Sequence, residues 1–128
     1  RHNMIKKIAT DKAPAAIGPY SQAYVAGDFL FISGQGPVDP SGATKPEGIT
    51  DCAEQMCKNI AAILEEAGAG FDKVVKTTCF LADMGDFAGF NEVYKKYFTS
   101  APARSCIAAK ELPAGFICEC EVIAYLGE

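Results

Sequence analysis

The segment 116–126 near the C-terminus carries the pattern that most restricts the fold. Its even-numbered positions are all apolar: Phe116, Cys118, Cys120, Val122, Ala124 and Leu126. Its odd-numbered positions mix two glutamates, Glu119 and Glu121, with Ile117, Ile123 and Tyr125. Successive side chains of a β-strand point to opposite faces of a sheet, so this strand has one fully apolar face and one mixed face. The pattern predicts helices over the even face and another subunit over the odd face, with charges near a cleft between chains.

Two segments have the spacing of amphipathic helices. In residues 51–67, apolar side chains recur at steps of three and four, with Asp51 and Glu54 as a capping start and Gly68 as the stop. Asp86 precedes a second such pattern, which runs to about Phe98 and is rich in aromatic residues. The chain is therefore expected to contain two helices.

The remaining segments predict strands. Residues 21–25 and 29–33 flank a Gly-Asp turn and form a hairpin, followed by a short third strand or loop. Glycines and prolines in residues 34–48 predict an ordered surface loop. Residues 71–82, 103–109 and 116–126 predict further strands, the last two joined by a turn at 112–115. The order β-β-(β)-α-β-α-β-β indicates an α+β protein, with a mixed, mostly antiparallel sheet and both helices on one face.

Length and composition restrict the class of protein. We interpret residues 4–128 as a single domain and leave residues 1–3, which precede Met4, out of the functional argument. No apolar run approaches the roughly 20 residues of a membrane span, and no signal layout is visible, so a soluble cytosolic protein is expected, with mitochondria as the alternative compartment. The formal net charge of −4 argues against general nucleic-acid binding.

Six cysteines lie at positions 52, 57, 79, 106, 118 and 120. No Cys-x-x-Cys pair or histidine partner accompanies them, so the sequence predicts no metal site. Cys118 and Cys120 share one strand face with Val122, which is typical of small core residues. We therefore expect buried free thiols in a reducing compartment.

Arg104 and Glu119 are the candidates for chemistry. An arginine presents a planar set of donors that matches a carboxylate, and a glutamate can orient water or accept its proton. The ordinary alternatives are an exposed arginine at a sheet end and solvated strand glutamates at positions 119 and 121, paired with Lys76 or Lys110. Cys106 shares the strand face of Arg104.

Three other positions have both a functional and an ordinary interpretation. Tyr20 follows a Gly-Pro turn and either points into a pocket or packs. The Ser33-Gly34 segment can bring backbone N–H groups near an anion, although a short glycine loop is a weak signal. Asn91, beside aromatic helix positions, is typical of a surface residue.

Taken together, the motifs resemble a known family. The segments Gly18-Pro19-Tyr20-Ser21-Gln22, Ile32-Ser33-Gly34-Gln35, Pro102-Ala103-Arg104-Ser105-Cys106 and Glu119-Cys120-Glu121-Val122 follow the order and spacing of the RidA (YjgF) family of reactive-intermediate deaminases. The resemblance spans about Ile8 to Leu126. It implies a chorismate-mutase-like protomer, a homotrimer, and clefts between subunits that work without a cofactor.

The same resemblance assigns roles to residues. By position, Arg104 matches the carboxylate-binding arginine, Glu119 the water-positioning glutamate and Tyr20 the cleft tyrosine. The positions that line the same cleft in the family correspond to Ser33, Gly34, Asn91 and Cys106. The chain departs from the family in a segment 97–102 that looks shorter than in some relatives, and in the cysteines that flank Glu119.

The implied activity is that of a 2-iminobutanoate/2-iminopropanoate deaminase, a hydrolase of C–N bonds that converts 2-imino or 2-enamino acids to 2-oxo acids and ammonia. In this hypothesis Arg104 holds the carboxylate of the imino acid and Glu119 directs water to C2. Cys106 as a covalent nucleophile is disfavoured because no histidine base accompanies it. The alternatives are a ligand-sensing or chaperone-like protein without chemistry, and a ribonuclease that inhibits translation, which the acidic charge disfavours.

Overall fold

A single six-stranded sheet organises the computed structural model, which describes residues 4–127. The strands are β1 (Ile5–Ile8), β2 (Ala23–Ala26), β3 (Phe29–Gln35), β4 (Val74–Leu81), β5 (Ala103–Ala108) and β6 (Cys118–Tyr125). Their order across the sheet is β1-β2-β3-β6-β4-β5, in which the β4–β5 pair is parallel and the other neighbours are antiparallel. The predicted mixed, mostly antiparallel sheet is confirmed. Residues 1–3, which we leave out of the functional argument, lie outside the residues that the structure describes.

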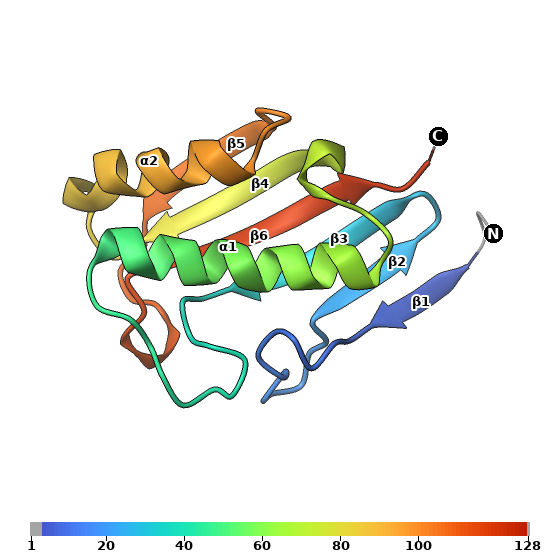
Figure 1. Ribbon diagram of the computed structural model, residues 1–128, viewed down its shortest axis with the longest axis horizontal. Helices are drawn as coiled ribbons and strands as arrows, with labels where there is room; N and C mark the ends of the chain where they lie inside the picture. The colour runs from blue at the N-terminus through green and yellow to red at the C-terminus, as the bar shows by residue number, and fades with distance from the viewer. Residues whose placement is uncertain (1–3, 128) are drawn as a thin grey trace.

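Two helices cover one face of the sheet. Figure 1 shows α1 (Ile49–Glu66) and α2 (Phe87–Tyr97) side by side in front of the strands, with α2 beside β5. The buried core lies between these layers and contains Leu30, Met56, Ile60, Ile63 and Phe90. The apolar even-numbered side chains of β6 from Cys118 to Ala124 all enter this core. The expected α+β protomer with both helices on one face is therefore confirmed.

The ends of α1 test the capping prediction. The helix begins after Gly48 without a side-chain cap, so the predicted capping start from Asp51 and Glu54 is wrong. Glu54 instead accepts a hydrogen bond from the hydroxyl of Tyr97, at 2.6 Å, and pairs with Lys96 on α2. Gly68 has a φ of +79° just after the helix, and a glycine adopts this conformation without the strain of a Cβ atom. The predicted stop at Gly68 is confirmed.

Other boundaries differ from the sequence-based expectation. The hairpin of β2 and β3 is present, but no strand follows it in the loop from residue 36 to 48. The additional strand is β1, which pairs with β2 at the sheet edge. Residues 71–73 form a 3₁₀ turn before β4. The strands β5 and β6 are not neighbours, because β4 lies between them.

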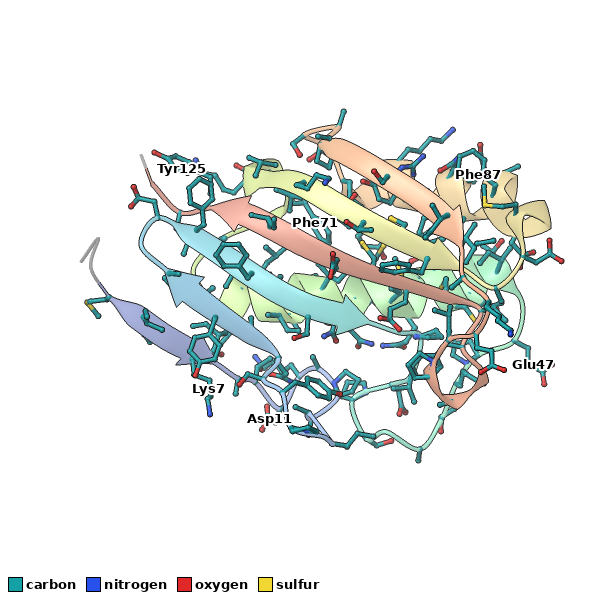
Figure 2. The ribbon with its side chains drawn as sticks, turned by 180° about the vertical axis from the view of Figure 1, so that it is seen from behind. Lys7, Asp11, Glu47, Phe71, Phe87 and Tyr125 are labelled. Carbon is teal, nitrogen blue, oxygen red and sulfur yellow. The ribbon has the colours of Figure 1, made fainter. Side chains whose placement is uncertain are left out.

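The second face of the sheet has no covering element within residues 4–127. Figure 2 views the molecule from this side, with the helices behind the strands. Phe29 and Tyr125 lie opposite each other on β3 and β6, with ring centres 5.5 Å apart. Tyr24, Phe29 and Phe31 are each about two-fifths exposed. We call this surface the open face. Its exposed apolar side chains agree with the large apolar residues that the sequence places at odd positions of the last strand.

Five of the six cysteines are buried, as expected, and Cys106 is partly buried. Cys79 and Cys120 are register partners on β4 and β6, with their sulfur atoms 3.7 Å apart in the core. Neither helix of residues 4–127 combines the length and the apolar character needed to cross a bilayer.

We expect Tyr97→Phe to destabilise the packing of α2 on α1. The lost hydroxyl bond holds the pKa of Glu54 below its ordinary value, so its contribution is present above the unfolded-state pKa and disappears as the pH falls through the lower folded-state pKa. At neutral pH the free energy of unfolding should fall by roughly 1 kcal/mol, since the pair is partly exposed. Denaturant titrations at neutral and acidic pH measure this difference, and an equal difference at both would contradict the assignment.

Candidate active site

Arg104 is held against helix α2 by three side chains. It lies on the edge strand β5, where its register partner is Thr77 of β4, a residue that faces the core. Its Nη1 atom donates a hydrogen bond to Oδ1 of Asn91, at 2.8 Å. Its guanidinium carbon lies 4.6 Å from the ring centre of Tyr94 and 5.5 Å from that of Phe87. The ordinary interpretation of Arg104 as a freely exposed side chain is therefore wrong.

The spacing of these three residues explains the arrangement. Positions 87, 91 and 94 are four and three residues apart, so they share one side of an α-helix. Two aromatic rings supply π surfaces for a cation, and Asn91 supplies an acceptor. Among residues 4–127, no other side chain accepts a hydrogen bond from the guanidinium. Arginine has five N–H donors, so most of them remain available to a ligand.

Glu119 lies on the opposite face of the sheet. It is an odd-numbered residue of β6, opposite Phe80 of β4, and its side chain is partly buried on the open face. Burial, and then the nearby charge of Glu121, raise the pKa of Glu119 above its ordinary value. A carboxylate in these surroundings is a better proton acceptor than one in bulk water. The ordinary alternative, in which the β6 glutamates pair with Lys76 or Lys110, has no support in the register, which places Phe80 and Thr78 opposite Glu119 and Glu121.

An irregularity in β3 lies against this carboxylate. The register between β3 and β6 shifts between Ile32 and Gln35, at Ser33 and Gly34. A Cβ atom on Gly34 would overlap the carboxylate of Glu119, whose Cδ atom lies 2.9 Å from that position. Glycine is therefore required for Glu119 to lie against the strand.

The hydrogen bonds of Ser33 connect this region to the loop that carries Tyr20. The Ser33 hydroxyl donates to the backbone oxygen of Ser21, at 2.6 Å, and its N–H donates to that of Gln22, at 2.9 Å. The Ser33 N–H is therefore occupied, and the approach of an anion to the other N–H groups of this segment stays a prediction. Tyr20 is 53% exposed in the protomer, so the interpretation as a tyrosine packed within the chain is wrong.

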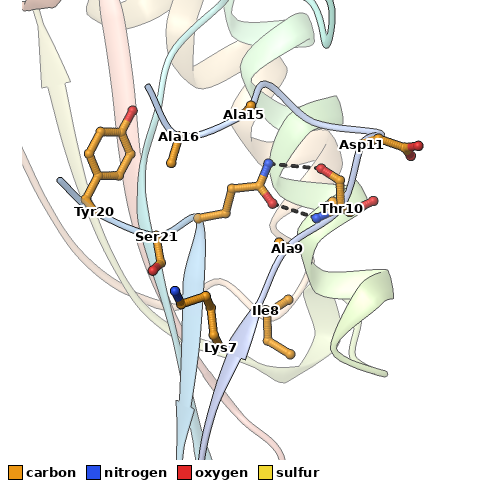
Figure 3. A pocket seen from close by; sticks show the side chains of 10 residues that line it. Lys7, Ile8, Ala9, Thr10, Asp11, Ala15, Ala16, Tyr20 and Ser21 are labelled. Carbon is orange, nitrogen blue, oxygen red and sulfur yellow. Dashed lines mark hydrogen bonds between the residues drawn. The ribbon is translucent and has the colours of Figure 1, made fainter. Parts of the chain in front are cut away.

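The side chain of Gln22 holds the loop between β1 and β2 through hydrogen bonds. Its buried side chain binds the N–H and the carbonyl of Thr10, the bonds dashed in Figure 3, and also the carbonyl of Pro14. Tyr20 and Ser21 line a hollow of about 450 Å³ there, and Ser21 and Ser33 line a second one of about 300 Å³ on the open face. Neither of these two hollows includes Arg104 or Glu119.

The candidate residues thus form two groups. The edge group consists of Arg104, Asn91 and Cys106, on the helix side of the β5 edge. The open-face group consists of Ser33, Gly34 and Glu119, and Tyr20 stands on the loop to which Ser33 is bound through Ser21. Arg104 points to the helix side of the sheet, like its register partner Thr77, and Glu119 points to the open face, so the two side chains of one protomer do not meet. Sequence reasoning paired them without this distinction.

Several supporting residues were not identified from the sequence. The sequence pattern predicts only an amphipathic helix around Phe87 and Tyr94 and a strand around Thr77, and it assigns no role to Gln22 within its motif. The helical spacing of Phe87, Asn91 and Tyr94 was visible, but only the β4–β5 pairing places Arg104 against it. Asn91 is partly exposed, as its interpretation as a surface residue allows, but the sequence gives no sign of its hydrogen bond to Arg104.

Cys106 occupies the next position along β5 that faces the helix side, opposite Cys79. Burial raises the pKa of the Cys106 thiol, so at neutral pH it is a poor nucleophile. Among the described residues, no three His, Cys, Asp or Glu side chains are grouped as a metal site would require.

Comparison with known proteins identifies the family. A model of the family described as Endoribonuclease L-PSP matches residues 10–126. The chain belongs to this family. Its sequence is 51% identical over 124 residues to the mouse protein named 2-iminobutanoate/2-iminopropanoate deaminase, a match that covers 95% of this chain and 92% of the mouse protein. The resemblance to RidA proteins is confirmed.

Solved structures of the L-PSP family share the fold. RidA from the Antarctic bacterium Psychrobacter sp. superposes with a TM-score of 0.90 at 44% identity, covering 94% of this chain and 98% of the other. The structure titled E. coli TdcF with bound serine gives a TM-score of 0.90 at 40% identity, with coverage of 94% and 98%. The sheet and both helices are therefore those of the L-PSP family.

We expect Gly34→Ala to displace Glu119 with little loss of stability, because the overlapping group is the end of a side chain that can rotate. A crystal structure of the variant should show the Glu119 carboxylate moved away from β3. The matched control is Gly42→Ala: that site is open but has a φ of +79°, so it should lose about 1 kcal/mol of stability while Glu119 stays in place. An unmoved Glu119 in Gly34→Ala would refute the steric argument.

Proposed function

We propose that this protein hydrolyses 2-imino and 2-enamino acids to 2-oxo acids and ammonia, as a homotrimer whose clefts each combine two chains. The observation that carries the proposal is the separation of the edge group from the open-face group. An arginine with available donors lies on one face, and a carboxylate with a raised pKa lies on the other. Both reach one substrate only if the β5 edge of one subunit lies against the open face of its neighbour.

Two further observations support this arrangement. The open face has the exposed aromatic side chains of Tyr24, Phe29 and Phe31, which a second copy would remove from water. The mouse relative at 51% identity is named as a deaminase of 2-iminobutanoate and 2-iminopropanoate, which are small acids with a C=N bond beside the carboxylate. A charge-assisted, two-point contact from Arg104 suits such a carboxylate.

The proposed chemistry needs modest assistance. Arg104 of one subunit binds the carboxylate, while Asn91 keeps one side of the guanidinium occupied. Glu119 of the neighbouring subunit orients a water molecule and accepts its proton as the oxygen bonds to C2 of the imine. Glu119 passes this proton to the nitrogen, which gives the carbinolamine. Transfer of the hydroxyl proton to nitrogen then breaks the C–N bond, forms the C=O bond of the 2-oxo acid and releases ammonia. In this proposal the rate enhancement comes from positioning of the substrate and from proton transfer. Proton transfer of this kind is worth on the order of 10²–10⁴-fold.

Tyr20 completes the open-face group in this proposal. Its exposed phenol stands on a loop whose position is fixed by Ser33 and Gln22. It would cover the substrate from the subunit that supplies Glu119. The raised pKa of Cys106 agrees with a lining role and disfavours a covalent thiol intermediate.

A protein that binds small carboxylates without chemistry is the second candidate. The TdcF structure titled with bound serine favours it, because serine offers the same carboxylate without an imine. Calorimetric binding of 2-oxobutyrate without any acceleration of imine hydrolysis would support this candidate over the deaminase. The family description as an endoribonuclease names a third activity, which the net charge of −4 disfavours.

Mixed trimers test the two-chain cleft directly. Arg104→Ala and Glu119→Gln should each abolish most deaminase activity. Co-expressed with two affinity tags and purified over both, the heterotrimers should regain about a third of wild-type activity, since one cleft in three receives both intact residues. The assay measures ammonia released from imino acids made in situ by an amino-acid oxidase. Heterotrimers as inactive as the parents would contradict the arrangement, provided that all assemblies remain trimeric.

The pH dependence of kcat/KM tests the role of Glu119. Its raised pKa predicts that activity falls on the acidic side as the carboxylate is protonated, at a higher pH than an ordinary glutamate would give. Glu121→Gln removes the neighbouring charge and should shift this acidic limb to lower pH. Glu65→Gln, on an exposed position of α1, is the control and should leave the limb unchanged. A limb that does not respond to Glu121→Gln would argue against Glu119 as the titrating group.

A further inference from the structure

A buried hydrogen-bonded pair lies beneath Arg104. The Tyr94 ring that carries the guanidinium has its hydroxyl 2.7 Å from Oγ1 of Thr77. Both residues are buried, and Thr77 is only 1% exposed. Thr77 is also the residue that pairs with Arg104 across β4 and β5. The three residues are therefore connected in a ring of contacts. The Arg104 guanidinium lies on the Tyr94 ring, the Tyr94 hydroxyl is hydrogen-bonded to Thr77, and Thr77 is the register partner of Arg104.

The hydroxyl pair is not required to fill space in the core. The other core-facing positions of β4 are Val74, Cys79 and Leu81, which bring no hydroxyl group into the core. A valine and a phenylalanine would occupy nearly the same volume as Thr77 and Tyr94. Burying two hydroxyl groups is unfavourable unless each satisfies the other, so their presence indicates a requirement for this bond.

The bond restricts the ring on which Arg104 rests. Phe98 stacks on Tyr94 with ring centres 4.2 Å apart and an interplanar angle of 19°, and Thr77 fixes the end of the ring that carries the hydroxyl. Burial raises the pKa of Tyr94 to about 12, so the ring stays a neutral phenol over the range of an enzyme assay. A guanidinium that must meet a carboxylate at two points gains from a fixed support.

We propose that Thr77 is a positioning residue, which acts through Tyr94 to set the orientation in which Arg104 binds the substrate carboxylate. This inference rests on the proposed deaminase function. Neither Thr77 nor Tyr94 needs to touch the substrate for this role. The contact between arginine and carboxylate persists from the bound substrate to the transition state, so a defect in positioning appears in KM rather than in kcat.

The test removes the hydrogen bond from either end. Thr77→Val and Tyr94→Phe should each raise KM for the imino acid roughly three- to tenfold, with kcat within about twofold of wild type. The double variant should be no worse than the poorer single variant, because both changes remove one bond. Thr77→Ser keeps the hydroxyl and should restore a KM near that of wild type.

Tyr97→Phe is the matched control. It makes the same change three residues further along α2, where the hydroxyl binds Glu54 instead. It should lower stability without changing KM. A variant of Thr77 or Tyr94 that unfolds at lower temperature but keeps the KM of wild type would overturn the proposal and leave a purely structural role.

A second measurement does not depend on turnover. The chain has two arginines, Arg1 and Arg104, so the Nε–H signal of Arg104 in an NMR spectrum is identified by its loss in Arg104→Lys. Thr77→Val should broaden or weaken this signal relative to wild type, and Thr77→Ser should preserve it. An unchanged signal in Thr77→Val overturns the inference.

The two proposals fail in distinguishable ways. If the wild type does not hydrolyse imino acids, or Arg104→Ala keeps full activity, the proposed function is wrong. The Arg104 signal then still decides whether Thr77 orders the guanidinium. If the wild type is active and depends on Arg104 while the Thr77 variants match it in KM and in the NMR signal, only the positioning role is wrong.

Discussion

The alternation of side chains along β6 is the constraint on which the structure depends. One face of that strand closes the core under the helices, and the other presents Glu119 opposite Phe80 of β4 and against Gly34 of β3. Since β5 holds Arg104 on the helix side, the sheet itself separates the two residues best suited to the proposed reaction. No side-chain rotation within one chain reverses this separation, because it is set by the pleat and the register.

Each group is supported by a different kind of contact. The edge group depends on a helix face, where two aromatic rings and one amide surround a permanent cation. The open-face group depends on the irregularity in β3 and on the absence of a side chain at Gly34. The first arrangement limits how the guanidinium can turn, and the second allows a carboxylate to lie against the backbone, where lower hydration raises its proton affinity.

The sequence predicts the elements of this fold better than it predicts their contacts. The two helices, the hairpin and the two-faced final strand follow from local periodicity, which is strong in residues 49–66 and 118–125. The strand β1 has only four residues, two of them lysines, so its apolar signal is too weak to stand out. The capping prediction at Asp51 is wrong because α1 begins at Ile49, which places Asp51 inside the first turn, and Glu54 is engaged by Tyr97 of the other helix.

The site shows the same division. Motif order identifies Arg104, Glu119 and their neighbours, and alternation places Glu119 on the mixed face of its strand, but no local pattern shows on which face of the sheet Arg104 lies. That information comes from the parallel pairing of β4 with β5, a contact between segments 27 residues apart in the register of Thr77 and Arg104. The support from Tyr94 and Thr77 depends on the same long-range pairing and was therefore not predictable from local pattern.

In the proposed cleft, the division of the site between two faces also ties activity to self-association. A lone chain carries every residue of the proposed cleft and yet has no complete copy of it, so dilution that dissociates the assembly would switch off catalysis without unfolding any chain. Specific activity would then depend on protein concentration. In such a protein each active site forms between two subunits, so a change on the β5 edge and a change on the open face affect the same site.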